Sequence, residues 1–255
     1  MREDSPYYEQ SLEVMRNSLL FKNLEEDFLK ETLSWFELKH LKKGTVIDSE
    51  ETLNWMYMPI SGRVKASQVN SYTGKEYIIL LLSAGDIFDV IALLEKREHI
   101  VILEAIDNVD NVDNVDNVDI LRVNADAARV WLDEHPQFNK NFLPYLGKRM
   151  RYLEENATDL ALSDTTTRLS KLILRNIDEV ESSKTNNHTV SLIDDLSNDI
   201  MAKMIGSVRA VVNRSIQILK SDEILETSRK DKRVKNLKEL IQRCEDTPFN
   251  KIAKK

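Results

Sequence analysis

Two arginines and an asparagine lie close together in the last quarter of the sequence, at spacings that suit one face of a helix. Arg209, Asn213 and Arg214 span six residues, and side chains three or four positions apart are neighbours on a helix surface. An arginine can donate two hydrogen bonds to guanine O6 and N7, and an asparagine can pair with adenine N6 and N7. If the helix exposes them, these side chains can recognise base edges in a DNA major groove.

A pair of short helices is predicted around these residues, in LSNDIMAKMIGSVRAVVNRSIQILKSDEIL (196–225). Ser197 is a candidate N-cap, and Gly206 suits a tight turn that needs a left-handed backbone. We expect the first helix to bury Ile200, Met201, Met204 and Ile205, with the small Ala202 where the second helix approaches. We expect the second helix, about Val208 to Lys220, to bury Val208, Val211, Val212, Ile216 and Leu219. The predicted DNA-binding residues are Ser197, Ser207, Arg209, Ala210, Asn213, Arg214 and Lys220.

The local charge supports this interpretation. Residues 196–235 hold nine Lys or Arg against five Asp or Glu, a net +4 on a chain whose net charge is −7. The acidic total argues against diffuse nucleic-acid binding by the whole surface, but it allows a local basic face. A plain helical hairpin with solvated arginines is the alternative at this point. A helix-turn-helix whose second helix enters the major groove is the interpretation we adopt.

The totals set limits on other functions. A chain of 255 residues with 42 % hydrophobic and 31 % charged residues is typical of a soluble protein of two modest domains. No apolar run approaches the roughly 20 residues that span a bilayer, and the N-terminus is too acidic for a signal peptide, so we expect a cytoplasmic protein without a membrane partner. Cys244 is the only cysteine, which excludes an internal disulfide, a cysteine-ligated iron–sulfur cluster and a cysteine-rich zinc site in one chain. No metal site and no catalytic motif is recognisable, so an enzyme is not expected.

The rest of the chain predicts an α+β protein. Helical spacing covers about residues 5 to 40, and short β-branched or aromatic runs from residue 41 to 107 predict an antiparallel barrel or roll. A long helix beginning near Pro136 follows, and Pro144 should kink its first turns. Its apolar residues are spaced 3, 4, 3, 4, 3, which is a heptad seam. The helix either packs on its own β domain or joins two copies of the chain, and we favour the dimer seam, made of Leu143, Leu146, Met150, Leu153, Ala157 and Leu160.

The ordered set of these segments resembles the Crp/Fnr transcription regulators. Residues 196–225 and the following RKDKRVKNL are similar to that family's winged helix-turn-helix, and LKKGTVI, MYMPISGRVK, GKEYIILLLSAGDIF and HIVILEAI follow the order of its cyclic-nucleotide-binding-type β-roll. The resemblance covers about residues 20 to 240. It implies an N-terminal antiparallel β-roll sensor (1–135), a dimerisation helix (136–163) and a C-terminal winged helix-turn-helix domain (164–255). It also implies a homodimer on double-stranded DNA, RNA polymerase as a partner and a small effector that controls the DNA-binding heads.

Two departures from the family pattern bear on specificity. Family members that bind cyclic AMP carry a Gly-Glu pair for the ribose and an Arg-Ser or Arg-Thr pair for the phosphate; here Asp89 with Val90 and His99 with Ile100 take these places. Without the arginine, and with Asp89 repelling an anion, we expect no tight binding of cyclic AMP. These four residues form the predicted effector pocket. Ala210 stands where many members place a glutamate that accepts from cytosine, which predicts a different or more permissive half-site.

The effector and any cofactor are not readable from the sequence. Haem would need an axial ligand, and His99 is the best placed of the four histidines, whereas Met56 and Met58 are more typical of core residues. Another class of function also fits: a signalling subunit whose β-roll binds a ligand and whose C-terminal helices contact a protein partner. Sequence-selective, salt-dependent DNA binding separates the two.

A repeated triplet, DNVDNVDNVDNVD, occupies residues 107–119. Its period of three fits neither a strand nor a helix, and deleting three copies would leave the short hairpin AIDNVDILRV. Aspartate and asparagine oxygens suit calcium, but the segment has no glycine for a sharp turn and no bidentate glutamate. We therefore interpret the repeat as a tandem-expanded loop inserted at a turn.

Overall fold

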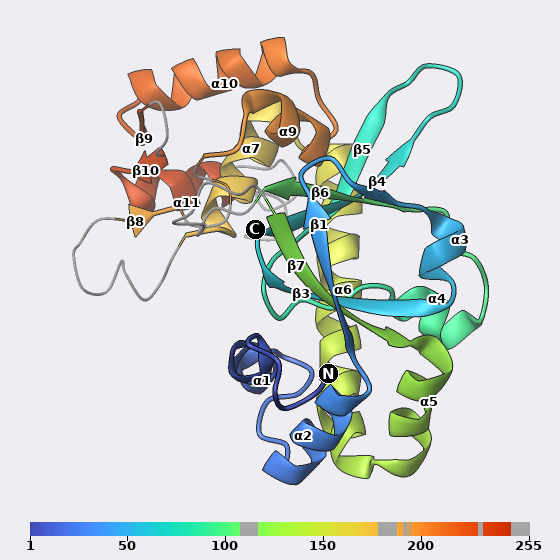
Figure 1. Ribbon diagram of the computed structural model, residues 1–255. Coiled ribbons are helices and arrows are strands. Elements are labelled where there is room, and N and C mark those ends of the chain that lie inside the picture. The colour runs from blue at the N-terminus through green and yellow to red at the C-terminus, as the bar shows by residue number, and fades with distance from the viewer. Residues whose placement is uncertain (108–116, 178–187, 191–192, 194, 229–231, 246–255) are drawn as a thin grey trace. The chain divides into compact units, whose positions relative to one another are not determined.

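The computed structural model describes residues 1–107, 117–177, 188–190, 193, 195–228 and 232–245 (Figure 1). The chain divides into two compact units. Unit 1 comprises residues 1–75 and 79–151, and unit 2 comprises residues 76–78 and 152–255. The predicted domain boundaries at residues 135 and 163 lie at the two ends of one long helix (Pro136–Leu162), whereas the division into two units falls within that helix. The three-part division therefore remains a prediction.

Unit 1 begins with two helices, α1 (Tyr8–Asn17) and α2 (Glu26–Ser34), followed by strand β1 (Glu37–Lys42). The prediction of helical structure to residue 40 is therefore wrong for its last residues. The reason is long-range pairing: Glu37 lies opposite Arg122 and Leu41 opposite Val118 in an antiparallel ladder with β7. Local spacing cannot register a partner strand about 80 residues away.

The strands of unit 1 form the predicted antiparallel roll (Figure 1). One sheet has the order β1-β7-β3 and the other the order β2-β6-β4-β5. The remaining strands are β2 (Val46–Ile47), β3 (Trp55–Ser61), β4 (Arg63–Val69), β5 (Glu76–Leu82), β6 (Ile102–Asp107) and β7 (Asn117–Asn124). Two short helices, α3 (Ser49–Thr52) and α4 (Val90–Glu95), complete the roll.

The two faces of β3 enter different cores, as strand alternation requires. Tyr57 is buried between the two sheets with residues such as Val64 and Leu103. Met56 and Met58 are 1 % and 0 % exposed, and they belong to a second core that also contains residues of α1, α2 and helix α5 (Ala125–Glu134). The prediction that these methionines are core residues is confirmed.

The repeated triplet connects strands of different sheets. β6 ends at Asp107 and β7 begins at Asn117, and the prediction of a simple hairpin between them is wrong, because β6 pairs with β2 and β4 whereas β7 pairs with β1 and β3. Residues 108–116 lie outside the described residues, and so does the calcium alternative. The last copy is part of the roll: Val118 is fully buried, and Asp119 accepts a hydrogen bond from Ser61 at 3.1 Å.

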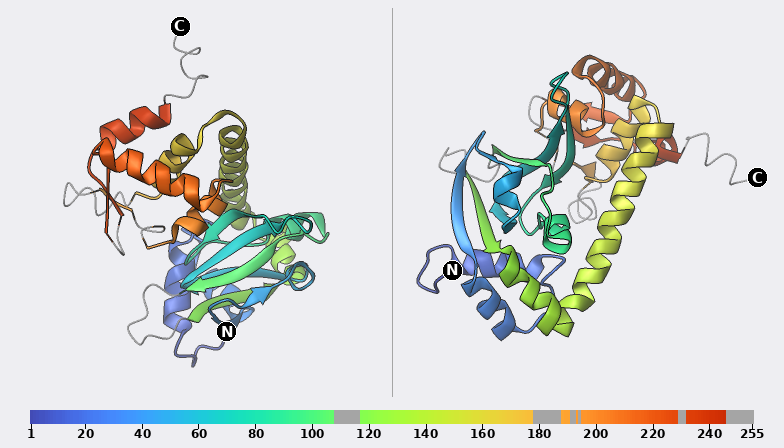
Figure 2. Two further views of the ribbon diagram at one scale, coloured as in Figure 1. Left: turned by 90° about the horizontal axis from the view of Figure 1, so that it is seen from above. Right: turned by 90° about the vertical axis from the view of Figure 1, so that its right-hand side faces the viewer.

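Helix α6 (Pro136–Leu162) is a single helix of 27 residues, clearest in the right-hand view of Figure 2. It continues through Pro144. Within unit 1, Phe138, Phe142 and Tyr145 are buried in the core with α5. In the part of the chain that the structure describes, no helix is long and apolar enough to cross a bilayer.

Unit 2 contains helices α7 (Thr165–Leu174), α9 (Asn198–Met204), α10 (Arg209–Ser221) and α11 (Leu237–Glu245). A small sheet has the order β8-β10-β9, formed by β8 (His188–Thr189), β9 (Leu225–Thr227) and β10 (Lys232–Val234). The two residues of β8 pair with Val234 and Arg233 of β10. The α+β fold class, with an N-terminal roll and a C-terminal helical domain, is confirmed.

Candidate nucleic-acid interface

The segment from α9 to α10 has helix-turn-helix geometry. The Ser197 hydroxyl accepts a hydrogen bond from the Ile200 amide at 3.3 Å, so the predicted N-cap of α9 is present. Gly206 adopts a φ of +64°, in the left-handed region that favours glycine, and Ser207 N donates to the Ala202 carbonyl at 2.8 Å. These bonds end α9 and fix the direction in which α10 begins.

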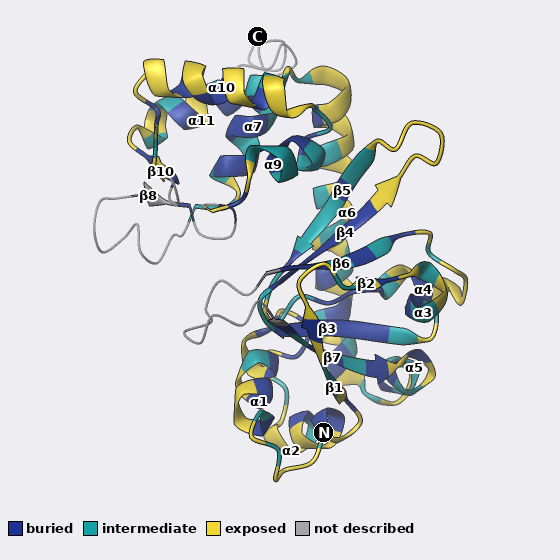
Figure 3. Cartoon of the chain, turned by 45° about the horizontal axis from the view of Figure 1, so that its top comes forward, coloured by how far each residue is buried: buried dark blue, intermediate teal, exposed yellow. Residues whose placement is uncertain are grey.

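Helix α10 has one buried and one exposed face, which Figure 3 shows in blue and yellow. Val212, Ile216 and Leu219 are buried as predicted, and Val211 is half-buried. Val208 is 58 % exposed, so the prediction that the helix buries it is wrong. It is the N-cap, with an extended backbone (φ −123°, ψ 151°), and helical periodicity does not apply to that position.

The exposed face carries the predicted base-reading side chains. Arg209, Ala210, Asn213 and Arg214 are all exposed. Within the described residues, neither the Arg209 nor the Arg214 guanidinium has an ion pair or a hydrogen bond, so both can donate to an external acceptor. Gln217 is not among the predicted DNA-binding residues, but it is exposed four residues after Asn213, and the i+4 spacing places it on the same face.

Two of the predicted residues are held by neighbouring elements. Asn198 Nδ2 donates to Asn213 Oδ1 at 2.6 Å, so a residue at the start of α9 orients the asparagine of α10. Lys220 Nζ donates to Thr227 Oγ1 at 3.3 Å, which connects the end of α10 to β9. The Asn198 contact is polar and has no periodic signal in the sequence. Ser197 is exposed and Ser207 half-buried, at the two ends of α9 and the turn.

The wing strands β9 and β10 pair with Lys232 opposite Thr227 and Val234 opposite Leu225. Lys232 is only 7 % exposed, and its Nζ donates to the carbonyls of Ile193 at 3.2 Å and Leu196 at 3.0 Å. This lysine is one of the nine basic residues of 196–235, but its ammonium binds the chain that precedes α9. The outward-facing charge is therefore smaller than the sequence count of +4.

Several known proteins resemble this chain in sequence or in fold. No protein-family model matches the chain. A CRP-like cAMP-activated global transcriptional regulator of Mycobacterium tuberculosis is 20 % identical over 205 residues, covering 80 % of this chain and 86 % of the relative. A CooA mutant structure from Carboxydothermus hydrogenoformans is 21 % identical with a TM-score of 0.65, covering 83 % and 89 % of the two chains. A CRP/FNR family transcriptional regulator from Thermus thermophilus is 19 % identical with a TM-score of 0.59, covering 82 % and 99 %.

The chain is therefore similar to CRP-like transcriptional regulators in sequence and to Crp/Fnr-type structures in fold. The predicted seam residues of α6 are mostly exposed. Five of the six are exposed, among them Leu143 at 66 % and Met150 at 70 %, and Leu146 is half-buried. Leu160 has a further contact: a Cβ built on Gly206 would lie 2.6 Å from Leu160 Cδ2, so the last seam residue packs against the turn before α10.

The predicted effector residues of the β-roll are only partly together. Asp89 is buried, caps α4 by accepting from Ala92 N at 3.2 Å, and lies 2.9 Å from His99 Nδ1. The His99 ring stacks on Phe88 with centroids 5.9 Å apart. Val90 is half-buried, whereas Ile100 is 73 % exposed, so the four do not line one enclosed site. A buried carboxylate occupies the place where the cyclic-AMP-binding pattern has a glycine.

Proposed function

We propose that this chain is a sequence-specific, DNA-binding transcription regulator that acts as a homodimer. The single observation that carries the proposal is the exposed face of α10. Arg209 and Arg214 have no partner within the described residues, on a helix whose opposite face is buried. Each copy would place α10 in a major groove of a near-palindromic site, with the two grooves about 34 Å apart.

The outer face of α6 supports the homodimer. Leu143, Met150, Leu153 and Leu160 are each at least 40 % exposed at heptad spacing. Apolar surface removed from water contributes about 25 cal/mol per Å², so a second copy of the same helix would bury these side chains favourably. Knobs-into-holes pairing of two identical seams is the geometry that a spacing of 3 and 4 residues favours.

The β-roll would bind a small effector that controls DNA binding, and RNA polymerase would be a further partner. The relative from Mycobacterium tuberculosis is named as cAMP-activated. Here Asp89 is buried at the corresponding position and would repel an anionic phosphate. We therefore propose an effector other than cyclic AMP.

Selection of bound duplexes from a random DNA pool, with and without cell extract as a source of effector, tests the proposal. The selected site should be a near-palindrome, and binding should weaken steeply as salt rises. Arg214→Ala should then cost about 1–3 kcal/mol on the selected site and relax the preference at one guanine. Sedimentation of the same sample should give a dimer.

Arg151→Ala is the matched control, because Arg151 is also an exposed arginine but lies on α6. It should leave both affinity and base preference unchanged. If the wild-type protein binds selected and random duplexes equally at every salt concentration, the base-reading role of α10 is wrong. Binding of a protein partner without any DNA binding would instead support the signalling-subunit alternative.

A further inference from the structure

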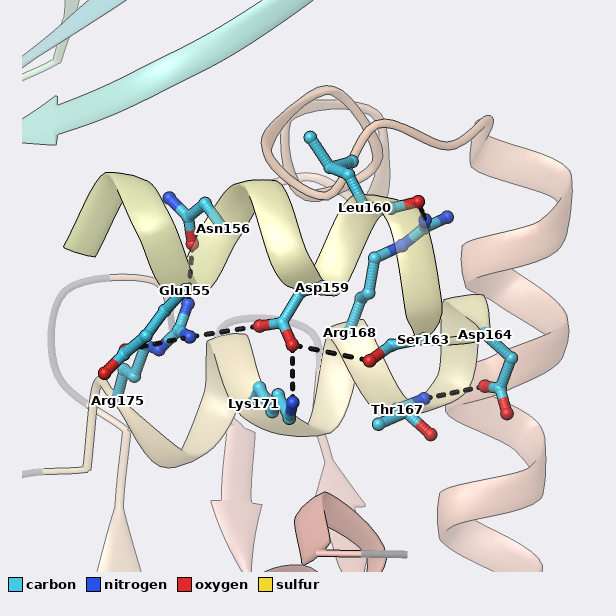
Figure 4. A network of polar contacts seen from close by, with 10 residues as sticks. All are labelled: Glu155, Asn156, Asp159, Leu160, Ser163, Asp164, Thr167, Arg168, Lys171 and Arg175. Atoms are coloured by element: carbon cyan, nitrogen blue, oxygen red, sulfur yellow. Dashed lines mark hydrogen bonds and ion pairs between the residues drawn. The ribbon is translucent and has the colours of Figure 1, made fainter. Parts of the chain in front are cut away.

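A buried carboxylate joins the last turns of α6 to α7 (Figure 4). Asp159 is 6 % exposed. One of its oxygens pairs with Lys171 and accepts from Ser163 Oγ at 3.3 Å, and the other lies 3.1 Å from Arg175 Nη2. Both cations belong to α7 and its C-terminal cap, one helical turn apart. The carboxylate therefore attaches two turns of α7 to one position of α6.

Two further residues of α6 reinforce the attachment. Arg175 Nη1 donates to Asn156 Oδ1 at 2.7 Å, and Arg175 Nη2 lies 3.3 Å from Glu155 Oε2. The Glu155 side chain is 50 % exposed, whereas that of Asp159 is 9 % exposed. Exposed ion pairs contribute little, and removing one partner of a buried pair is strongly unfavourable, so Asp159 is the dominant member of this network.

The attachment and the dimer seam lie on different faces of the same helical segment. At about 100° per residue, Asp159 is separated by roughly 120° from Leu153 and roughly 160° from Ala157. All these residues, with α7, α9 and α10, belong to unit 2. The network thus fixes the angle between α7 and the part of the proposed seam that belongs to unit 2.

A second contact connects α7 to α10, so the orientation of α7 also affects that of α10. Thr166 of α7 shares a hydrogen bond of 2.9 Å with Ser215, which is 2 % exposed on the buried face of α10. The N-terminus of α7 does not depend on Asp159, because Asp164 caps it by accepting from Thr167 N at 2.8 Å. Removing the Asp159 charge should therefore allow the angle between α6 and α7 to vary without unwinding α7.

We infer that Asp159 is a positioning residue that sets which half-site spacing the dimer accepts. This inference rests on the proposed function. Two α10 helices bind one duplex together only when their separation and rotation match those of the two grooves. One inserted base pair moves the half-sites apart by about 3.4 Å and rotates them by about 34°. A dimer in which the angle between α6 and α7 is fixed should bind the altered operator weakly. A dimer in which this angle can vary should keep most of its affinity.

The test compares the full-length wild type with Asp159→Asn, which is nearly isosteric but removes the charge. Each binds the selected operator and versions with one base pair added to or removed from its centre. The wild type should lose about tenfold or more in affinity on the altered spacings, because only one head can then engage. Asp159→Asn should lose less than about threefold, with an unchanged preference for bases within each half-site. Glu155→Gln removes the exposed member of the network and should behave like the wild type.

The outcomes are distinct. If Asp159→Asn is folded by circular dichroism and keeps the spacing preference of the wild type, the inference is wrong. A uniform loss of affinity and base preference would also contradict it, since that is the signature of general destabilisation. If Asp159→Asn does not fold, Lys171→Met removes one cation, leaves Arg175 on Asp159, and should relax the spacing preference in the same direction. If the wild type selects no DNA, the proposed function itself fails, and the inference fails with it.

Discussion

Gly206→Ala should destabilise unit 2 by about 2–3 kcal/mol, and the cost has two separate sources. The backbone at Gly206 has a φ of +64°, and a non-glycine residue in the left-handed region costs about 1–2 kcal/mol. The new Cβ would lie 2.6 Å from Leu160 Cδ2. That atom is the end of a flexible side chain, so relief of the overlap should cost only about 1 kcal/mol more.

Gly74→Ala isolates the backbone cost. Gly74 has a φ of +65° and nothing within 4 Å of an added Cβ, so its substitution should cost about 1–2 kcal/mol without an overlap. Urea unfolding measures both variants. The chain's three tryptophans are Trp35, Trp55 and Trp131, all in unit 1, so fluorescence follows the Gly74 variant and circular dichroism also follows unit 2.

The contact with Leu160 is then tested by a double-mutant cycle. Adding Leu160→Ala to Gly206→Ala should give a coupling of about 1 kcal/mol, because the overlap disappears. All variants are measured at one protein concentration, since Leu160 also lies in the proposed seam. If Gly206→Ala costs no more than Gly74→Ala and shows no coupling, the contact between α6 and the turn is wrong. If it costs nothing at all, the left-handed turn is wrong.

Three further outcomes are expected. Burial raises the pKa of the Cys244 thiol to about 11, so a thiol reagent at pH 8 should react on the order of 100-fold more slowly with folded than with urea-unfolded protein. Because the folded pKa exceeds the unfolded value, this thiol's contribution to stability is complete below about pH 8.5 and is lost as pH rises towards 11; equal reaction rates would contradict its burial. Deleting residues 110–112 removes one copy of the triplet and leaves six residues between Asp107 and Asn117, so unfolding free energy and DNA affinity should change by less than about 1 kcal/mol. Calorimetric titration with cyclic AMP should show no binding in the micromolar range, and micromolar affinity would refute the role assigned to buried Asp89.

Periodicity predicted the parts of the fold in which one face of an element is buried locally. The buried residues of α10 followed the helical period, and Met56 and Met58 took the same side of β3 while Tyr57 took the other. Val208 did not follow the period because the N-cap has an extended backbone. The same spacing argument therefore succeeds inside the helix and fails at the N-cap residue that precedes it.

Elements defined by distant partners could not be predicted in this way. β1 exists because it pairs with β7, and β8 exists because Val234 and Arg233 lie opposite its two residues. The polar contacts of the candidate interface and of the Asp159 network could not be predicted from residue spacing either. Nothing in the spacing of Asn198 and Asn213, or of Asp159 and Arg175, distinguishes them from solvated surface residues, although each pair is joined in the structure.

Two structural requirements favour glycine at position 206, one from the turn between α9 and α10 and one from helix α6. The sequence predicts it from the turn alone, since a left-handed backbone favours glycine. The structure adds a second requirement, because Leu160 of α6 occupies the space that a side chain would need. Leu160 also ends the proposed seam, so pairing of two α6 helices would restrict its rotamers against the turn that directs α10. A substitution at position 160 or 206 should therefore change both the pairing of two α6 helices and the placement of α10. Sequence periodicity gives no link between these two properties.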